Sequence, residues 1–360
     1  MPISQVPFAG ISNPVDFRNI VINGDMQIAQ RATSVASITT PGYYTLDRFY
    51  IENTTLGTFT MSQSTDVPTG QGFANSLKLD CTTADASPAA ADNLWIEQRF
   101  EGQNLQYLKY GTANAQYLTL SFWVKSTKTG TFIAGFIHND NPSAGLISKS
   151  YTVNVSNTWE FKTITFPGDT ANVFDNDNAF SLSLHFYLGM GSNYTSGTLQ
   201  TTWANYVAAN RAVGQVNIAD STSNDFLITG VQLEAGEQAS GFEFLPIDVD
   251  LARCLRYFQT FRGENVYICQ GGMQATTTFV GTVNYLVTMR ATPTFTANSG
   301  ASYFRIFTTA GSSFSTVAVN DLYGTRSMGI AATTGSLTAG QSGALRCLSA
   351  DAKVDYSAEL

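Results

Sequence analysis

Two segments in the middle of the chain alternate between apolar and other side chains with a period of two residues. In "YLTLSFWVKS" the apolar positions are Leu118, Leu120, Phe122 and Val124. In "FSLSLHFYLG" they are Phe180, Leu182, Leu184, Phe186 and Leu188. Because successive side chains of a strand point to opposite faces, this period predicts half-buried antiparallel strands.

Further short strand-like segments surround these two, among them "YTVNVS", "WEFKTITF" and "DFLITGVQLE". Turn-rich intervals separate the segments, and helical periodicity is almost absent before residue 245. Many short strands with frequent turns are typical of a two-sheet sandwich or jelly roll. We therefore predict an all-β protein whose residues 1–245 form a β-sandwich.

The segment "IDVDLARCLRYF" breaks the strand pattern and predicts a short helix that Asp248 or Asp250 caps. We assign residues 246–262 to this helical linker. Gly-, Thr- and Ser-rich strand candidates follow it, so residues 263–360 are predicted to form a smaller C-terminal β domain. That domain is small and polar, and a partner surface or oligomer would stabilise it.

Composition excludes several classes of protein. Only 13% of the residues are charged and the formal net charge is −8, so nucleic acid is not an expected partner. The four cysteines lie far apart in the sequence and are predicted to be reduced thiols: Cys81, Cys254, Cys269 and Cys347. The start "MPISQVPFAG" has no signal-peptide pattern and no apolar run could cross a bilayer, so we expect cytoplasmic synthesis without membrane insertion.

The sequence contains few residues or motifs that are typical of a catalytic site. His138 and His185 are its only histidines, and common nucleophile, zinc and phosphate-binding motifs are absent. Acidic residues that could form a glycosidase pair are Asp47, Glu97, Glu101, Asp175 and Asp177, but almost any chain of this length offers such pairs. "DNDN" and "NGD" are read as turns rather than calcium loops. We expect no catalytic residue, no metal and no cofactor.

The faces opposite the apolar positions are unusually aromatic. They carry Tyr117, Trp123 and Lys125 on the first strand and His185 and Tyr187 on the second. If both strands lie in one sheet, these rings and polar groups could bind a sugar, which needs flat apolar surfaces and hydrogen-bonding partners. Alternatively, the face packs against the other domain or a neighbouring subunit.

A long polar connection, "GSNYTSGTLQTTWANYVAANR", carries Tyr194, Trp203 and Tyr206. Exposed aromatic side chains in such loops often serve recognition. The same loop could instead be a lid packed over the edge of the sandwich. Both interpretations remain open at this point.

Several pieces of the sequence, in their order, resemble a family of tailed-bacteriophage virion proteins, mostly tail fibre or receptor-binding proteins. The pieces are "INGDMQIAQR", "YYTLDRFYI", "LTLSFWVKS", "TFPGDT", "ITGVQLEAG", "FEFLPIDVDLARCLRYF" and "VDYSAEL". The resemblance implies an N-terminal jelly roll like a carbohydrate-binding module, a short helix and a smaller β domain. Related modules often hold a structural calcium ion, but the corresponding places here are Gln27 and the Asp-free "ITGV", so no calcium site carries over.

The resemblance implies a virion fibre or spike protein that binds the host cell surface, through its polysaccharide, without catalysis. The expected partners are two further copies in a homotrimer, other phage structural proteins of the tail or capsid, and a host surface glycan. A purely structural head fibre, capsid decoration or tail adaptor is the alternative, and a glycan depolymerase is the second.

Overall fold

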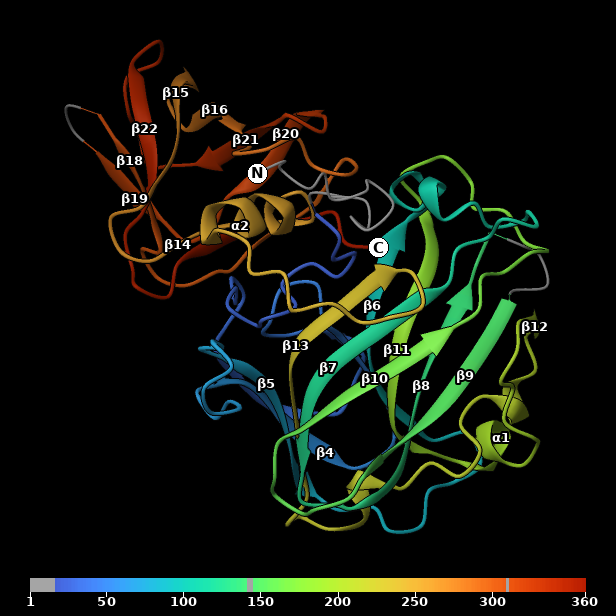
Figure 1. Ribbon diagram of the computed structural model, residues 1–360. Coiled ribbons are helices and arrows are strands. Elements are labelled where there is room, and N and C mark those ends of the chain that lie inside the picture. The colour runs from blue at the N-terminus through green and yellow to red at the C-terminus, as the bar shows by residue number, and fades with distance from the viewer. Residues whose placement is uncertain (1–16, 141–144, 309–310) are drawn as a thin grey trace, which may run out of the picture.

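The alternating segments form strands of two sheets that face each other across one core (Figure 1). The computed structural model describes residues 17–140, 145–308 and 311–360. Sheet A contains six strands, in the order β1 (Ser34–Ile38), β4 (Thr58–Ser64), β5 (Ser76–Thr83), β13 (Asp225–Ala235), β7 (Leu118–Ser126) and β10 (Glu160–Phe166). Sheet B contains seven, in the order β12 (Ala204–Asn205), β9 (Gly145–Val153), β8 (Gly130–His138), β11 (Phe180–Met190), β6 (Asn93–Glu101), β3 (Tyr50–Thr54) and β2 (Gly42–Tyr43). The predicted all-β jelly-roll sandwich is confirmed.

The sandwich core is built from the inward side chains that the alternation predicts. Phe122 of β7 meets Phe186 of β11 edge to face, with the ring centroids 5.1 Å apart. Both rings are at most 1% exposed. Burying such a ring fully contributes about 2 kcal/mol. Since β7 and β11 supply one core from opposite sheets, their outer faces point away from each other.

A glycine-dependent turn closes one end of the sandwich. In the segment "INGD", Asn23 adopts a left-handed backbone conformation with φ of 61°. A Cβ atom on Gly24 would lie 2.2 Å from the carbonyl oxygen of Val231 in β13. The backbone N–H of Val231 in turn donates to the carbonyl of Gly24 at 2.9 Å. Only glycine fits at this position, which ties the N-terminal turn to sheet A.

The expected helix leads out of the sandwich as α2 (Ile247–Leu255). Capping by Asp248 or Asp250 was the wrong prediction, because Pro246 occupies the N-cap and no side chain caps the helix. The Asp250 carboxylate instead accepts the backbone N–H of Asn23 at 3.3 Å. Both aspartates lie in the first helical turn, where negative charge favours the helix dipole.

The C-terminal domain has two sheets and its own core. Sheet C has the order β14 (Phe258–Arg262), β23 (Lys353–Ser357) and β17 (Thr294–Ala297). Sheet D has the order β19 (Ser312–Phe314), β18 (Phe304–Phe307), β22 (Ser342–Cys347), β15 (Tyr267–Ala275), β16 (Thr278–Asn284), β21 (Ser327–Thr333) and β20 (Ala318–Tyr323). Because β14 pairs with β23, the predicted helical linker 246–262 is too long at its C-terminal end.

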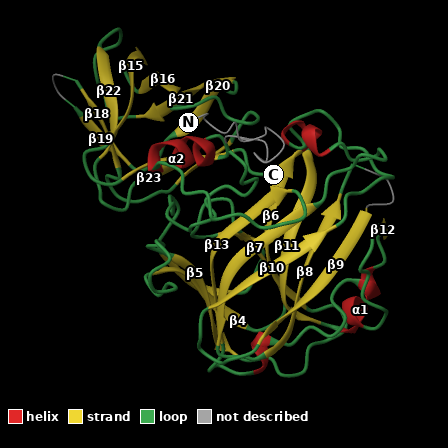
Figure 2. Cartoon of the chain, in the orientation of Figure 1, coloured by secondary structure: helices red, strands yellow, loops and turns green. Residues whose placement is uncertain are grey.

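In the described part of the chain, the other helical pieces are short (Figure 2). They are α1 (Ser192–Thr195) and the 3₁₀ turns Gly102–Asn104, Gln106–Leu108, Ala208–Asn210 and Ile218–Asp220. Within the described ranges, no helix has the length and apolar character needed to span a membrane. All four cysteines are buried, and none forms a disulfide.

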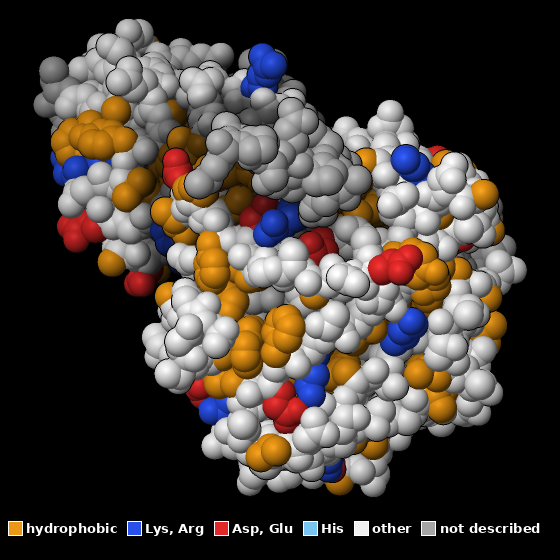
Figure 3. Space-filling model, viewed as in Figure 1, with side chains coloured by type: hydrophobic (Ala, Val, Ile, Leu, Met, Phe, Trp, Pro, Cys, Tyr) orange, Lys and Arg blue, Asp and Glu red, His pale blue; other side chains and the backbone are white. Residues whose placement is uncertain are grey.

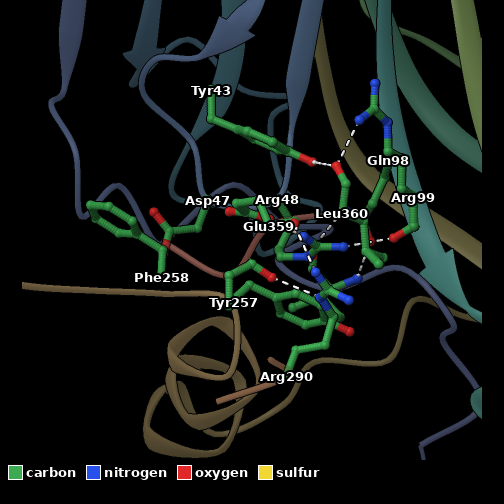
Figure 4. A network of polar contacts seen from close by, with 12 residues as sticks. Tyr43, Asp47, Arg48, Gln98, Arg99, Tyr257, Phe258, Arg290, Glu359 and Leu360 are labelled. Carbon is green, nitrogen blue, oxygen red and sulfur yellow. Dashed lines mark hydrogen bonds and ion pairs between the residues drawn. The ribbon is translucent and has the colours of Figure 1, made fainter. Parts of the chain in front are cut away.

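The last residues of the chain return to the junction between the two domains (Figure 4). Glu359 forms ion pairs with Arg48 and, at 3.1 Å, with Arg31 of the sandwich domain. The side chains of Arg48 and Glu359 are only 1% and 6% exposed. The Arg48 guanidinium also lies 3.5 Å from the ring centroid of Tyr257, just after α2. One carboxylate thus ties the C-terminal segment to the sandwich.

Further polar contacts surround this ion pair. Arg99 of β6 donates to the carbonyl oxygen of Leu360 at 2.6 Å, and the Tyr43 hydroxyl donates to the same oxygen at 3.4 Å. Arg290 of the C-terminal domain donates to the carbonyl of Asn178, which precedes β11, at 2.8 Å. The two domains are therefore joined by charged and backbone hydrogen bonds as well as by α2.

Candidate functional site

The two aromatic strand faces predicted to form one platform lie on opposite sides of the sandwich. Trp123 is on β7 of sheet A with Tyr117 just before the strand, whereas His185 and Tyr187 are on β11 of sheet B. The prediction of a platform shared by both strands is therefore wrong. Alternation determines which side chains of a strand face the core, but not which of the two sheets the strand joins.

The outer face of β11 is covered rather than exposed. Tyr187 is 0% and His185 2% exposed. Arg211, from the loop that follows β11, donates Nε to the Tyr187 hydroxyl at 3.0 Å. Its guanidinium lies 4.1 Å from the Trp95 ring centroid, and Tyr194 packs against the same cluster. Neither His185 nor Tyr187 can therefore contact a ligand on this surface.

Ser183, His185 and Glu97 form a buried chain of polar contacts. Ser183 Oγ lies 2.6 Å from His185 Nε2, and Glu97 Oε2 lies 3.3 Å from His185 Nδ1. Arg211 Nη2 lies 3.1 Å from the same Nδ1, so this ring nitrogen faces both a guanidinium donor and a carboxylate acceptor. Burial lowers the pKa of His185 well below its usual value, and Arg211 and Arg99 lower it further.

This arrangement is unsuited to nucleophilic catalysis. His185 is only 2% exposed. Ser183 is also only 1% exposed, so a substrate cannot reach its oxygen. We interpret the cluster as a hydrogen-bonded support beneath the loop that carries Arg211.

The acidic residues considered as a glycosidase pair lie in different environments. Asp47, Glu97 and Glu101 are at most 3% exposed, whereas Asp175 and Asp177 lie exposed in a turn. Burial alone would raise the pKa of Glu101, but hydrogen bonds from Arg256 and Tyr257 lower it, the opposite of what a general acid needs. Among the described residues, no three His, Cys, Asp or Glu side chains are grouped to hold a metal ion.

The long polar loop packs as a cover. The Trp203 indole N–H donates to the carbonyl oxygen of Pro167 at 2.7 Å. The Trp203 ring lies edge-on to Tyr110, with centroids 5.9 Å apart. Tyr194, Trp203 and Tyr206 are all half-buried. This geometry agrees with the lid interpretation more closely than with a freely projecting recognition loop.

An aromatic row crosses the outer face of sheet A. Trp123 of β7 lies directly opposite Phe161 of β10 in the ladder, with ring centroids 5.3 Å apart. On its other side Trp123 is opposite Thr229 of β13. Trp123 is half-buried and Phe161 is 49% exposed. The row therefore has two adjacent ring faces, whereas the Thr229 hydroxyl is buried and donates to the carbonyl oxygen of Asn75 at 2.7 Å.

A polar cluster adjoins this row and fixes another indole. Asp66 accepts Lys125 Nζ at 2.7 Å and the indole N–H of Trp159 at 2.9 Å. Lys125 is two residues from Trp123 on the same face of β7, and Trp159 is two residues from Phe161. Burial alone would raise the pKa of Asp66, but the hydrogen bonds from Lys125 and Trp159 lower it, so it remains ionised. The Trp159 ring is thereby held in one orientation beside hydrogen-bonding groups.

Three phenylalanines extend the apolar surface across β13. The ring centroid of Phe73 lies 5.1 Å from that of Phe242 and 5.2 Å from that of Phe244. A Cβ on Gly230 of β13 would lie 2.5 Å from the Phe73 ring, which places that ring directly over the strand. Phe244 is 48% exposed. Glycine at position 230, with φ of 60°, makes room for this ring.

Figure 3 shows these features on one face of the molecule. Hydrophobic side chains gather over β13 and β7, and acidic and basic side chains lie beside them. We define the sheet A surface as the aromatic side chains Trp123, Trp159, Phe161, Phe73, Phe242 and Phe244 with the polar pair Lys125 and Asp66. It is the candidate binding site.

Of this surface, only Trp123 and Lys125 were on the face that the sequence analysis considered for sugar binding. The same period of two places Trp159 and Phe161 opposite Ile164 and Phe166 in "WEFKTITF", and that signal could have found them. Phe73 could not have been found in this way, because it reaches the surface from a loop between β4 and β5.

Comparison with known proteins gives remote similarities. No protein-family model and no curated protein matches the sequence. Among solved structures, the enzymatically active domain of a bacteriophage CBA120 tailspike protein has 17% identity and a TM-score of 0.32, and the match covers 61% of this chain and 22% of that one. The chain therefore spans less than a quarter of the tailspike domain's length.

Two carbohydrate-binding modules give similar values. The family 11 module of a Clostridium thermocellum cellulosomal cellulase has 12% identity and a TM-score of 0.28, covering 61% of this chain and 96% of that module. The N-terminal cellulose-binding domain of a Cellulomonas fimi β-1,4-glucanase also has 12% identity and a TM-score of 0.28, covering 59% of this chain and all (100%) of that domain. The function of the chain is therefore inferred from its own surfaces.

Proposed function

We propose that this chain is a non-catalytic component of a tailed-bacteriophage particle that binds carbohydrate of the host cell surface. The observation that carries the proposal is the pairing of Trp123 with Phe161 beside the Lys125–Asp66 contact. Sugar rings present apolar faces and hydroxyl edges, so a site for them combines aromatic stacking with fixed polar partners. The sheet A surface offers both without rearrangement.

The charges on this surface favour a ligand rich in hydroxyl groups. Lys125 and Asp66 neutralise each other at 2.7 Å, and Lys78 is paired with Asp225 at 3.0 Å on the neighbouring strands. Paired charges of this kind can donate to and accept from hydroxyls while presenting little net charge. The surface therefore suits a neutral stretch of polysaccharide.

The phage assignment is supported by where the resembling pieces lie in the fold. "INGDMQIAQR" forms the turn sealed by Gly24, and "ITGVQLEAG" belongs to β13. "FEFLPIDVDLARCLRYF" contains α2, and "VDYSAEL" contains most of β23 and Glu359. Several of the pieces contact one another, since Gly24 of the first packs against Val231 of "ITGVQLEAG" and Arg48 of "YYTLDRFYI" pairs with Glu359 of the last.

Catalysis is not part of the proposal. The buried Ser183–His185 contact leaves no accessible nucleophile there, and Glu101 is held ionised by Arg256. Asp175 and Asp177 remain exposed but lie two residues apart in one turn. Two carboxylates that flank a glycosidic bond must instead face each other across the substrate.

A titration with surface polysaccharide from a bacterial strain that the phage infects tests the proposal. Wild-type protein should bind, Trp123→Phe should retain most of the affinity, and Trp123→Ala should lose about five-fold, since one ring stack is worth about 1 kcal/mol. Tyr107→Ala is the control, because Tyr107 is an exposed aromatic residue (45%) outside the sheet A surface. Equal binding by all four proteins would contradict the proposed site.

A further inference from the structure

Sheet D of the C-terminal domain carries a row of side chains whose residue types differ from those of the sheet A surface. In sheet D, Arg305 of β18 lies directly opposite Arg346 of β22, and Arg346 lies directly opposite Tyr267 of β15. Ser313 of β19 continues the row on the far side of Arg305. Two arginines thus face each other between a tyrosine and a serine, across four adjacent strands.

The row lies on the outer face of sheet D. The neighbours in sequence, Ile306 and Leu345, are buried in the domain core, so alternation turns the arginines outward. Tyr267 is 56% exposed, and the two arginines are half-buried. Figure 3 shows hydrophobic and basic atoms side by side at the end of the domain that holds β18 and β22.

A single aromatic ring orders both guanidinium groups. The centroid of Phe307 lies 3.8 Å from the guanidinium carbon of Arg346 and 4.9 Å from that of Arg305. Stacking on the ring restricts both side chains before any ligand arrives. A pre-ordered pair of guanidinium groups suits a planar anion, which each can bind with two parallel hydrogen bonds.

Neither arginine has its charge compensated within the described part of the chain. Among the described side chains, no carboxylate oxygen lies within ion-pair distance of either group, and the buried Nε atoms of Arg305 and Arg346 have no hydrogen-bond partner. By contrast, Arg48 and Arg256 each pair with a glutamate. Like charges placed directly opposite in a sheet are destabilising, so this arrangement is best explained by an anion that bridges them.

We propose that this row is a binding site for an acidic sugar, with the sugar carboxylate between Arg305 and Arg346 and the sugar ring against Tyr267. The exposed Tyr267 ring adjoins the charge pair and supplies an apolar face that an inorganic anion would not use. The site is separate from the sheet A surface, whose paired charges suit neutral sugar. The protein would thereby contact a polysaccharide through two chemically different sites.

The test is a titration of the full chain with an oligomer of galacturonic acid, and with a neutral galactose oligomer of equal length. We expect the acidic oligomer to bind at least ten-fold more tightly and its affinity to fall with added salt. Arg346→Gln should lower that affinity about ten-fold and Tyr267→Ala several-fold. Arg326→Gln, which removes an exposed arginine elsewhere in the domain, should leave it unchanged.

Stability provides a second readout, because Arg346→Gln relieves the repulsion from Arg305. Its unfolding temperature should be equal to or higher than that of the wild type. Equal affinity for acidic and neutral oligomers, or full affinity in Arg346→Gln, would overturn the proposal. If inorganic phosphate binds as tightly as the galacturonic acid oligomer, the proposal that the site recognises a sugar is wrong. A third outcome would assign the row to a contact between copies of the chain. In that outcome, the wild type does not bind the galacturonic acid oligomer, and Arg346→Gln lowers the mass of the protein assembly.

The two sites can fail separately. Trp123→Ala should leave binding of the acidic oligomer unchanged, because Trp123 lies in the other domain. Loss of acidic-oligomer binding in Trp123→Ala would show that this ligand uses the sheet A surface and would contradict the sheet D site.

Discussion

Trp123 and Phe161 occupy directly opposed positions in the antiparallel ladder of β7 and β10, with their ring centroids 5.3 Å apart on the outer face of sheet A. The residues on either side of Trp123, Phe122 and Val124, are completely buried in the sandwich core. Successive residues of β7 therefore alternate between the core of the sandwich and the candidate binding surface.

This separation predicts different stability effects for adjacent substitutions. Phe122→Ala should reduce the free energy of unfolding by about 3–5 kcal/mol, because it leaves a cavity in the core. Trp123→Ala should reduce it by less than about 1 kcal/mol, because the ring lies on the surface. Denaturant unfolding of both variants measures the difference. Equal losses would mean that Trp123 is part of the packed core.

The sequence predicted the core of the sandwich better than its surfaces. The period of two identified the inward side chains of β7 and β11 correctly. It did not show that β7 and β11 belong to different sheets, because sheet membership depends on pairing between distant strands. Nor did it reveal that Arg211 covers Tyr187, since that contact joins a strand to a loop with no periodic signal.

The sheet D row illustrates the same limit. Arg305 and Arg346 are far apart in the chain and become neighbours only through the register of β18 and β22. The helix between the domains was predicted from local pattern alone, but its end was not. Phe258–Arg262 forms a strand of sheet C because it pairs with β23. The prediction that these residues belong to a helix did not include this pairing.

The junction between the domains should depend on one buried carboxylate. Glu359→Gln leaves Arg48 charged and buried without its partner, so we expect a loss of about 3–5 kcal/mol in the free energy of unfolding. Thermal or denaturant unfolding measures it. Lys353→Gln is the control, because the Lys353–Asp355 pair is partly exposed and should contribute less than about 1 kcal/mol. Similar effects of the two substitutions would contradict the proposed role of Glu359.

The buried carboxyl group of Asp47, beside the same junction, predicts that the stability of the fold depends on pH. Burial raises its pKa to about 6 from 3.8, against the opposing effect of Arg31. The folded state therefore binds more protons than the unfolded state between these pH values, and this group's contribution to stability is lost as the pH rises from about 4 to 6.

Asp47→Asn removes that contribution. The stability of the variant relative to the wild type should increase with pH over this interval, by up to about 1.4 kcal/mol per pH unit, and become constant above it. Denaturant unfolding at several pH values tests the sign. A relative stability that falls with rising pH would mean that the Arg31 contact, not burial, dominates the pKa of Asp47.

We predict that the purified chain is a homotrimer, since repetition about an axis can cover exposed apolar side chains such as Leu286, which is 69% exposed. Light scattering should give a mass of three chains. A folded, soluble monomer at micromolar concentration would contradict this prediction.

We also predict that the protein does not cleave the glycan it binds. Incubation with host surface polysaccharide should leave the polymer's size distribution unchanged. New reducing ends that disappear in Asp175→Asn or Glu97→Gln would establish a depolymerase instead.

The most direct test of the sheet A surface combines two measurements on the double variant Trp123→Ala/Phe161→Ala. Because both rings are on the outer face of one sheet, the variant should keep the wild-type oligomer mass while its affinity for host polysaccharide falls about 30-fold, corresponding to about 2 kcal/mol of lost stacking. Unchanged affinity with a reduced oligomer mass would contradict the account and identify the surface as a contact between subunits.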